Sequence, residues 1–225
     1  MATAAGLRKN DRMRLQTFLF DLDGTLLDHF AAIQRAHTYT MKQLGLPAPT
    51  SAQVRAAVGG GVEVAVRRLV GAELTAAALA IYRPYWDATM LEDVTLLPGA
   101  RELLTALKQR GAKTGIFTNK HGPSSRKICA HLGVEPLLDV NFGATDTPWL
   151  KPDPEFAAHV LSALGAAAAT TVLVGDSPYD LAAAQNGGFG FYGVTTGTHT
   201  AEELRIAGAA NVYPDLVALT PVLLK

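Results

Sequence analysis

The chain has 225 residues, of which 48% are hydrophobic and 18% are charged, with 20 basic and 20 acidic side chains. This apolar content and the zero net charge exclude a disordered chain and give no sign of a nucleic-acid-binding surface. The single cysteine, Cys129, excludes an intramolecular disulfide and a zinc site built on cysteines. No apolar run approaches the ~20 residues that span a bilayer, and Met1–Arg14 lacks the apolar run of a signal peptide. We therefore expect a cytoplasmic protein that binds no membrane.

The first predicted elements are a polar tail and a strand. Residues 1–13 are small and polar without periodicity, and an apolar stretch follows at Leu15–Phe20. That stretch stops at Asp21-Leu22-Asp23-Gly24-Thr25, a polar turn that contains a glycine. The pattern is typical of a buried parallel strand that delivers polar residues to its carboxyl end.

Residues 29–93 have helical periodicity and no convincing strand. Residues 54–70 and 75–91 indicate further helices, with interruptions at Gly59-Gly60-Gly61 and Gly71. This block therefore predicts an all-helical insert. The apolar face of its first helix comprises Phe30, Ile33, His37, Met41 and Leu44.

After Pro98-Gly99, strands and helices alternate. The expected helices are 100–110, 123–132, 155–164 and 179–186, and the expected strands are 113–118, 140–145, 171–175 and 190–194. Such alternation is typical of βαβ units in a parallel sheet. The predicted fold class is α/β: a Rossmann-like parallel-sheet core with helices on both faces (1–28 and 94–225) and an inserted all-helical cap (29–93).

Polar side chains cluster in the sequence where the predicted strands end, the edge at which open α/β sheets bind ligands. Two unit charges ~4 Å apart repel by about 4 kcal/mol at an effective dielectric near 20, so neighbouring carboxylates favour a bound cation. Oxygen ligands favour Mg²⁺, and a metal with a lysine and N–H donors suits a phosphoryl group. The side chains expected at this edge are Asp21, Asp23, Thr118, Asn119, Lys151, Asp176 and Asp180.

Four segments carry a resemblance to a known family. In chain order they resemble the four motifs of the haloacid dehalogenase superfamily, and the helical insert after the first motif is similar to that family's type 1 cap. The resemblance covers nearly the whole chain beyond the tail. The segments are Asp21-Leu22-Asp23-Gly24-Thr25, Thr118-Asn119, Lys151-Pro152 and Gly175-Asp176-Ser177-Pro178-Tyr179-Asp180.

The resemblance implies catalytic and phosphate-binding roles. Asp21 would be the nucleophile that forms an aspartyl-phosphate. Asp23 would be the general acid for the leaving oxygen and then the base that activates water, two roles that one carboxyl group can serve in turn. Thr118 would bind phosphate through its hydroxyl and Asn119 through its backbone N–H. Lys151 would neutralise the nucleophile and the phosphate.

The resemblance also implies a magnesium site. Asp21, the backbone carbonyl of Asp23 and Asp176 would hold Mg²⁺. Asp180 would support the metal shell or orient Lys151. From the residues alone, Asp180 is equally well explained as a helix cap.

The implied activity is that of a Mg²⁺-dependent phosphatase acting on a small phosphorylated metabolite, most similar to the phosphoglycolate phosphatase-like group. Asp23 separates it from superfamily branches that lack the second aspartate. One alternative is a sugar phosphomutase, although the mutases usually carry serine where this chain has Asn119. The other is a non-catalytic binding protein on the same scaffold, which would not need Asp23. The sequence is compatible with a monomer.

The predicted cap contains two features with open interpretations. Gly59-Gly60-Gly61 is either a specificity loop that reaches the site or a plain turn between helices. Arg67 and Arg68 either contact an anionic substrate or only solvate a helix. The residues expected to pack within the cap are His37, Tyr82, Tyr85 and Trp86.

Overall fold

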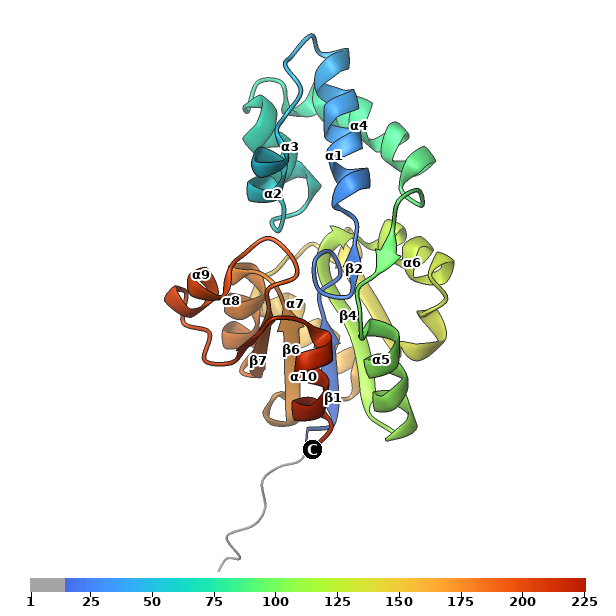
Figure 1. The fold of residues 1–225 in the computed structure, drawn as a ribbon, viewed down its shortest axis with the longest axis vertical. Helices are drawn as coiled ribbons and strands as arrows, with labels where there is room; N and C mark the ends of the chain where they lie inside the picture. The colour runs from blue at the N-terminus through green and yellow to red at the C-terminus, as the bar shows by residue number, and fades with distance from the viewer. Residues whose placement is uncertain (1–14) are drawn as a thin grey trace, which may run out of the picture.

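The computed structural model describes residues 15–225, so the expected tail and the Met1–Arg14 segment lie outside it (Figure 1). Its main element is a six-stranded sheet in the order β5-β4-β1-β6-β7-β8, in which every pairing is parallel. The α/β fold class is thereby confirmed. The strands are β1 (Thr17–Phe20), β4 (Lys113–His121), β5 (Val140–Ala144), β6 (Thr171–Gly175), β7 (Gly190–Val194) and β8 (Val212–Tyr213).

Helices cover both faces of the sheet because β1 presents apolar side chains to both. Phe18 and Phe20 pack in one cluster with residues of α5, α6 and α10, whereas Leu19 packs in a second cluster with residues of α7 and α8. The flanking helices are α5 (Ala100–Gln109), α6 (Gly122–His131), α7 (Pro154–Leu164), α8 (Pro178–Gly187), α9 (Ala201–Ile206) and α10 (Leu216–Leu223). No helix among residues 15–225 is long and apolar enough to cross a membrane.

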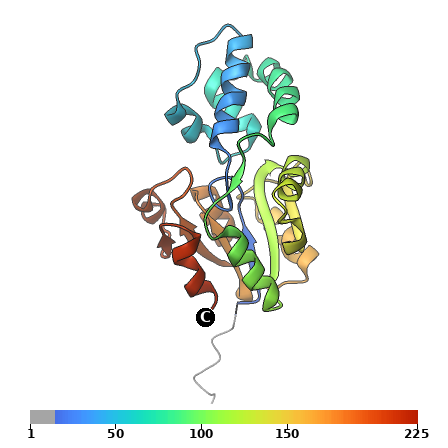
Figure 2. The same ribbon diagram turned by 45° about the vertical axis from the view of Figure 1, so that its right-hand side comes forward.

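Four further helices lie together beyond the carboxyl ends of the strands, and we call them the cap helices (Figures 1 and 2). Two short antiparallel strands, β2 (Leu27–Asp28) and β3 (Thr95–Leu96), connect them to the sheet. Their place above the sheet agrees with the predicted insert, and the division into domains at residues 29 and 93 stays a prediction. The cap helices are α1 (Phe30–Gln43), α2 (Ser51–Ala57), α3 (Val62–Val70) and α4 (Thr75–Thr89).

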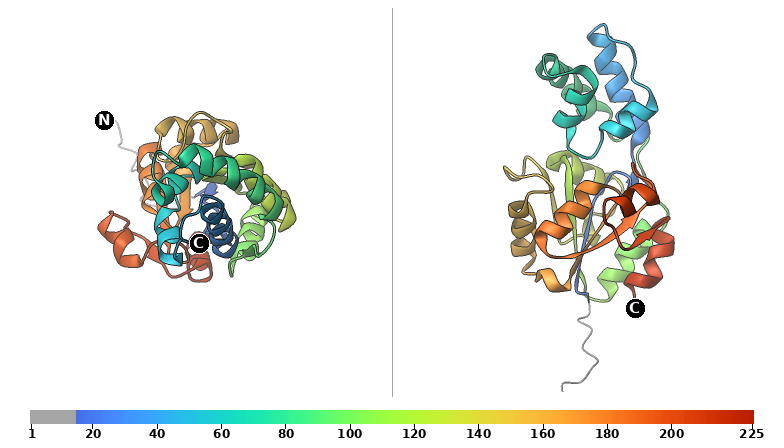
Figure 3. Two further views of the ribbon diagram at one scale, coloured as in Figure 1. Left: turned by 90° about the horizontal axis from the view of Figure 1, so that it is seen from above. Right: turned by 90° about the vertical axis from the view of Figure 1, so that its left-hand side faces the viewer.

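The chain contains elements that the sequence did not predict. β2 and β3 have two residues each, too few to show a period of two. α10 contains Pro221, which argues against a helix in a sequence. The β2–β3 pair bears on the site, because these two strands connect the cap helices to the sheet near the strand ends (Figure 3).

Candidate active site

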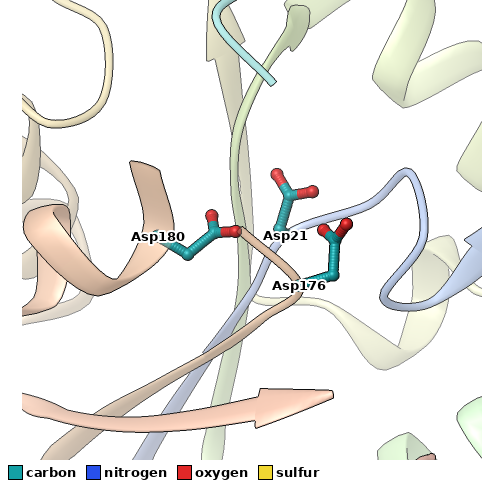
Figure 4. Close-up of side chains that lie close together, drawn as sticks. All are labelled: Asp21, Asp176 and Asp180. Carbon is teal, nitrogen blue, oxygen red and sulfur yellow. The ribbon is translucent and has the colours of Figure 1, made fainter. Parts of the chain in front are cut away.

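Three carboxylates meet at the carboxyl end of the sheet (Figure 4). Asp21 directly follows β1, Asp176 directly follows β6, and Asp180 lies in the first turn of α8. One carboxylate oxygen of each lies within 4.8 Å of the others. The structure therefore brings together three of the four aspartates that the sequence placed at a metal site. The fourth, Asp23, directs its carboxylate to a different set of partners.

Lys151 lies between two of these carboxylates. Its Nζ atom is 2.7 Å from Asp21 Oδ1 and 2.5 Å from Asp180 Oδ1. Burial alone would lower the pKa of Lys151, but the charges of Asp180 and Asp21 outweigh it and raise that pKa above its ordinary value. Lys151 is therefore a fixed positive charge at the base of the site.

Asp180 has both of its carboxylate oxygens occupied. Oδ1 binds Lys151, and Oδ2 accepts hydrogen bonds from the Ser177 backbone N–H (3.0 Å) and hydroxyl (2.6 Å). The contacts with Ser177 form part of the N-terminal cap of α8. Asp180 thus serves as a helix cap and orients Lys151 at the same time.

Asp176 is held by a loop after β7 that the sequence analysis did not identify. Its Oδ2 atom accepts hydrogen bonds from the Thr198 backbone N–H at 2.7 Å and from the Thr198 hydroxyl at 2.9 Å. A Cβ atom at Gly197 would collide with this carboxylate, so the loop approaches it as closely as a glycine permits. Asp176 is thereby fixed with its Oδ1 atom turned away from the loop contacts, 3.4 Å from the Thr25 hydroxyl.

The donor set fits a hard divalent cation. Burial raises the pKa of Asp176 to about 8 and that of Asp21 to about 6, and in both cases neighbouring carboxylates add to the effect. A cation bound between these carboxylates would offset both the loss of solvation and their mutual repulsion, and oxygen-only ligands suit Mg²⁺. Among the described residues, Asp21 Oδ2 has no hydrogen-bond partner and Asp176 Oδ1 has only the long Thr25 contact. These two oxygens are free to act as ligands.

Asp23 forms an ion pair with Lys120, a partner that the sequence analysis left without a role. Lys120 Nζ lies 3.0 Å from Asp23 Oδ1 and 2.7 Å from Oδ2, and it sits 4.7 Å from the centre of the Trp86 ring. Burial alone would raise the pKa of Asp23, but Lys120 and His29 outweigh it and hold that pKa well below its usual range. The pKa of Asp23 is therefore shifted in the opposite direction from the pKa values of Asp21 and Asp176.

His29 joins Asp23 to the end of α4. Its Nε2 atom is 2.7 Å from the Met90 carbonyl oxygen, and its Nδ1 atom is 3.5 Å from Asp23 Oδ1. Because a carbonyl oxygen only accepts, Nε2 carries the proton. Nδ1 can then hydrogen-bond to Asp23 only when a further proton lies between the two side chains.

Thr118 and Asn119 lie at the end of β4, where the sequence placed them. The Asn119 side chain donates to the backbone carbonyls of Gly59 and Lys151, both at 3.0 Å, and its Oδ1 atom accepts from the Lys151 N–H at 2.7 Å. Asn119 therefore fixes Lys151 and also holds the glycine loop of the cap. Thr118 and Asn119 both line the cavity described next.

A cavity of about 220 Å³ lies between the strand ends and the cap helices. Asp21, Thr118 and Lys151 line its sheet side. Gly59 and Gly61 line it from the cap, so the loop of three glycines reaches the site. The other cap residues along it are mainly apolar or aromatic and include Ile33, His37, Val62, Ala65, Tyr82 and Trp86.

The two arginines proposed as substrate contacts do not line the cavity. Arg67 lies 3.5 Å from Glu63, one turn away on α3. Arg68 binds backbone carbonyls at the end of α2 and the Tyr179 hydroxyl, the latter at 3.1 Å. The interpretation as substrate contacts is therefore wrong for this arrangement. Arg83 of α4 lines the rim instead.

Comparison with known proteins points to one family. The model of the family described as "Haloacid dehalogenase-like hydrolase" matches residues 18–194. The chain is 31% identical over 216 residues to a Dickeya dadantii protein named "Probable phosphatase IndB", covering 92% of this chain and 94% of the relative. It is 32% identical over 205 residues to the phosphoglycolate phosphatase of Yersinia pestis, covering 88% and 86%.

The fold is shared with solved structures. A haloacid dehalogenase-like family hydrolase from Streptococcus pneumoniae superposes with a TM-score of 0.85 at 24% identity. The superposition covers 92% of this chain and 98% of that one, so it includes the cap helices as well as the sheet.

Proposed function

The chain belongs to the haloacid dehalogenase-like hydrolase family and is a small-molecule phosphatase, and we propose that it transfers the phosphoryl group of a small phosphate monoester to Asp21 and then to water. The observation that carries this proposal is the position of Asp21. Its carboxylate lies at the base of a cavity, held 2.7 Å from the ammonium of Lys151, with one oxygen atom free of hydrogen bonds from the described residues.

In the first step, a carboxylate oxygen of Asp21 attacks phosphorus, and the bond from phosphorus to the ester oxygen breaks. Lys151 neutralises charge on the transferred group, and Thr118 donates its hydroxyl to it. Asp23 gives the leaving oxygen a proton that it first shares with His29, whose Nδ1 atom lies 3.5 Å from Asp23 Oδ1. In the second step, Asp23 takes a proton from water as the water oxygen attacks phosphorus, which releases phosphate and restores Asp21.

We propose that Mg²⁺ would be held by Asp21, Asp176 and the backbone carbonyl of Asp23. When bound, the ion supplies positive charge that favours the approach of an anionic phosphate to an anionic nucleophile. Thr198 fixes Asp176 in place, and Asp180 acts through Lys151 because both of its oxygens are occupied.

The cavity supports a small substrate. Its volume of about 220 Å³ is below the roughly 300 Å³ at which pockets for drug-sized ligands begin. A phosphoryl group and a leaving group of only a few heavy atoms fill such a space. The Yersinia pestis relative is named for phosphoglycolate, a compound of this size, which makes it the first substrate to assay. A cytoplasmic location and a monomeric state stay predictions.

The test is phosphate release from a panel of small phosphate esters, with Mg²⁺ and with EDTA. The wild-type chain is expected to release phosphate only with the metal, and Asp21→Asn to lose at least about a thousandfold in kcat. Asp215→Asn is the matched control, since Asp215 caps α10 away from the cavity and asparagine is an equally good cap. Turnover by a folded Asp21→Asn variant would contradict the proposal.

A further inference from the structure

Two polar side chains lie in the cap wall of the cavity, and we call them the roof pair. His37 of α1 is 3% exposed and Tyr82 of α4 is 5% exposed, and both line the cavity. Their rings are 4.8 Å apart, so they present one joint surface. The sequence analysis expected both residues to pack within the cap, and their position on the cavity wall was not predicted.

The roof pair has no hydrogen-bond partner within residues 15–225. Burial by itself lowers the pKa of His37, and burial with the charge of Asp23 raises that of Tyr82, with no hydrogen bond contributing to either. Their polar atoms are not among the fully buried atoms without a partner, so although the rings are buried these atoms are open to the cavity. A ligand in the cavity can therefore replace solvent as the hydrogen-bond partner of both side chains.

Both groups are uncharged at neutral pH. The pKa of His37 is lowered to about 4, and the raised pKa of Tyr82 keeps its phenol protonated. The neutral imidazole offers one donor and one acceptor, and the phenol offers either. Around them the cap wall is formed by Ile33, Val62 and Ala65, which offer no polar side-chain atoms.

Two of the three lysine and arginine side chains that line the cavity already have partners. Lys120 is paired with Asp23, and Lys151 is shared by Asp21 and Asp180. Arg83 is exposed at the rim, where Asp87 also lines the cavity. A carboxylate placed against the roof pair would leave water for neutral rings and apolar side chains, and burial of a charge in such surroundings is unfavourable.

Resting on the proposed function, we propose that His37 and Tyr82 bind a neutral hydroxyl or carbonyl group at the far end of the leaving group and select against a carboxylate there. The substrate class is then a small phosphate ester whose leaving group has an apolar body and a neutral polar end. Phosphoglycolate, whose leaving group ends in a carboxylate, ranks below such esters.

Three esters of matched length test the selection. They are 3-hydroxypropyl phosphate with a neutral polar end, propyl phosphate with an apolar end, and 3-phosphooxypropanoate with a carboxylate. With Mg²⁺ present, kcat/KM is expected to be highest for the hydroxypropyl ester and at least tenfold lower for the carboxylate. A preference for the carboxylate, or for phosphoglycolate, over the hydroxypropyl ester would overturn the proposal.

Variants test whether the roof pair causes the selection. Tyr82→Phe should lower kcat/KM for the hydroxypropyl ester about three- to tenfold more than for the propyl ester, as expected for one lost hydrogen bond. His37→Leu should do the same, and His37→Gln, which keeps a donor and an acceptor, should restore part of the difference. Tyr85→Phe is the control, because Tyr85 lies three residues further along α4 and stacks on Tyr39 outside the cavity.

The outcomes separate this proposal from the function on which it rests. If the wild type hydrolyses all three esters and Tyr82→Phe changes them by the same factor as Tyr85→Phe, the roof pair is structural and the proposal fails while the phosphatase assignment stands. If no ester is hydrolysed and Asp21→Asn is indistinguishable from wild type across the panel, the proposed function itself fails.

Discussion

Lys120 and Asp23 form a nearly buried ion pair, with Lys120 Nζ 2.7 Å from Asp23 Oδ2 and side-chain exposures of 7% and 13%. Lys120 also lies over the ring of Trp86, so the pair connects the end of β4, the turn after β1 and helix α4 of the cap. One cation therefore controls the charge of the proposed general acid and contacts the cap.

Replacing Lys120 with methionine is expected to lower the free energy of unfolding by about 3 kcal/mol, because it leaves a buried carboxylate without its counter-charge. Chemical denaturation measures the loss. Lys108→Met is the control, since Lys108 and Asp139 form an ion pair that is 32% and 34% exposed and should contribute less than about 1 kcal/mol.

The double variant Lys120→Met with Asp23→Asn decides whether the charge is the cause. Removing both charges should recover most of the lost stability. If the double variant is as unstable as the sum of the single variants, the two side chains are not energetically coupled and the account of this pair is incorrect.

Crowding of the carboxylates predicts that the stability of the metal-free protein depends on pH. The pKa of Asp176 is raised from 3.8 to about 8, so between these values the folded chain keeps a proton that the unfolded chain releases. In EDTA, the stability contributed by this group is therefore present below pH 4 and is lost as the pH rises toward 8. Asp176→Asn should flatten this slope, and Mg²⁺ should raise the melting temperature of the wild type more than that of the variant. An unchanged slope in Asp176→Asn would contradict this origin.

The burial of His37 predicts that stability changes with pH in the opposite direction. Burial lowers its pKa from 6.5 to about 4, so the unfolded chain binds a proton in this range and the folded chain does not. Its contribution to stability is present above pH 6.5 and is lost as the pH falls through 4, by about 3 kcal/mol in total. With Mg²⁺ present, His37→Leu should reduce the acid-side slope, and the exposed His131→Leu should not. Equal slopes in the two variants would show that His37 does not remain neutral in the folded chain.

The sheet and its polar edge could be predicted because their signals are local. Asp21 and Asp176 each directly follow a short apolar strand, and parallel strands bring their carboxyl ends to one edge. The same logic placed Thr118 and Asn119. The loop of three glycines was expected at the site only as one of two interpretations of a break between two cap helices.

The remaining features of the site depend on contacts between distant segments. Thr198 reaches Asp176 across 22 residues of sequence, and Lys120 reaches Asp23 across 97. No local sequence pattern predicts either contact. The roof pair was missed for a related reason: helical periodicity shows that His37 lies on the apolar face, but not that this face borders a cavity.

The most direct test of the central claim is to trap the phosphoryl group on Asp21. Acetyl phosphate labelled with ³²P is suitable because acetate leaves without needing a proton, so Asp23→Asn should still form the covalent intermediate and be slow to hydrolyse it. With Mg²⁺, an acid quench of Asp23→Asn should leave about one hydroxylamine-labile label per chain on the peptide that contains Asp21. The Asp21→Asn variant should carry no label. A wild-type chain that turns over acetyl phosphate while the label is absent, or lies on another residue, would contradict the account.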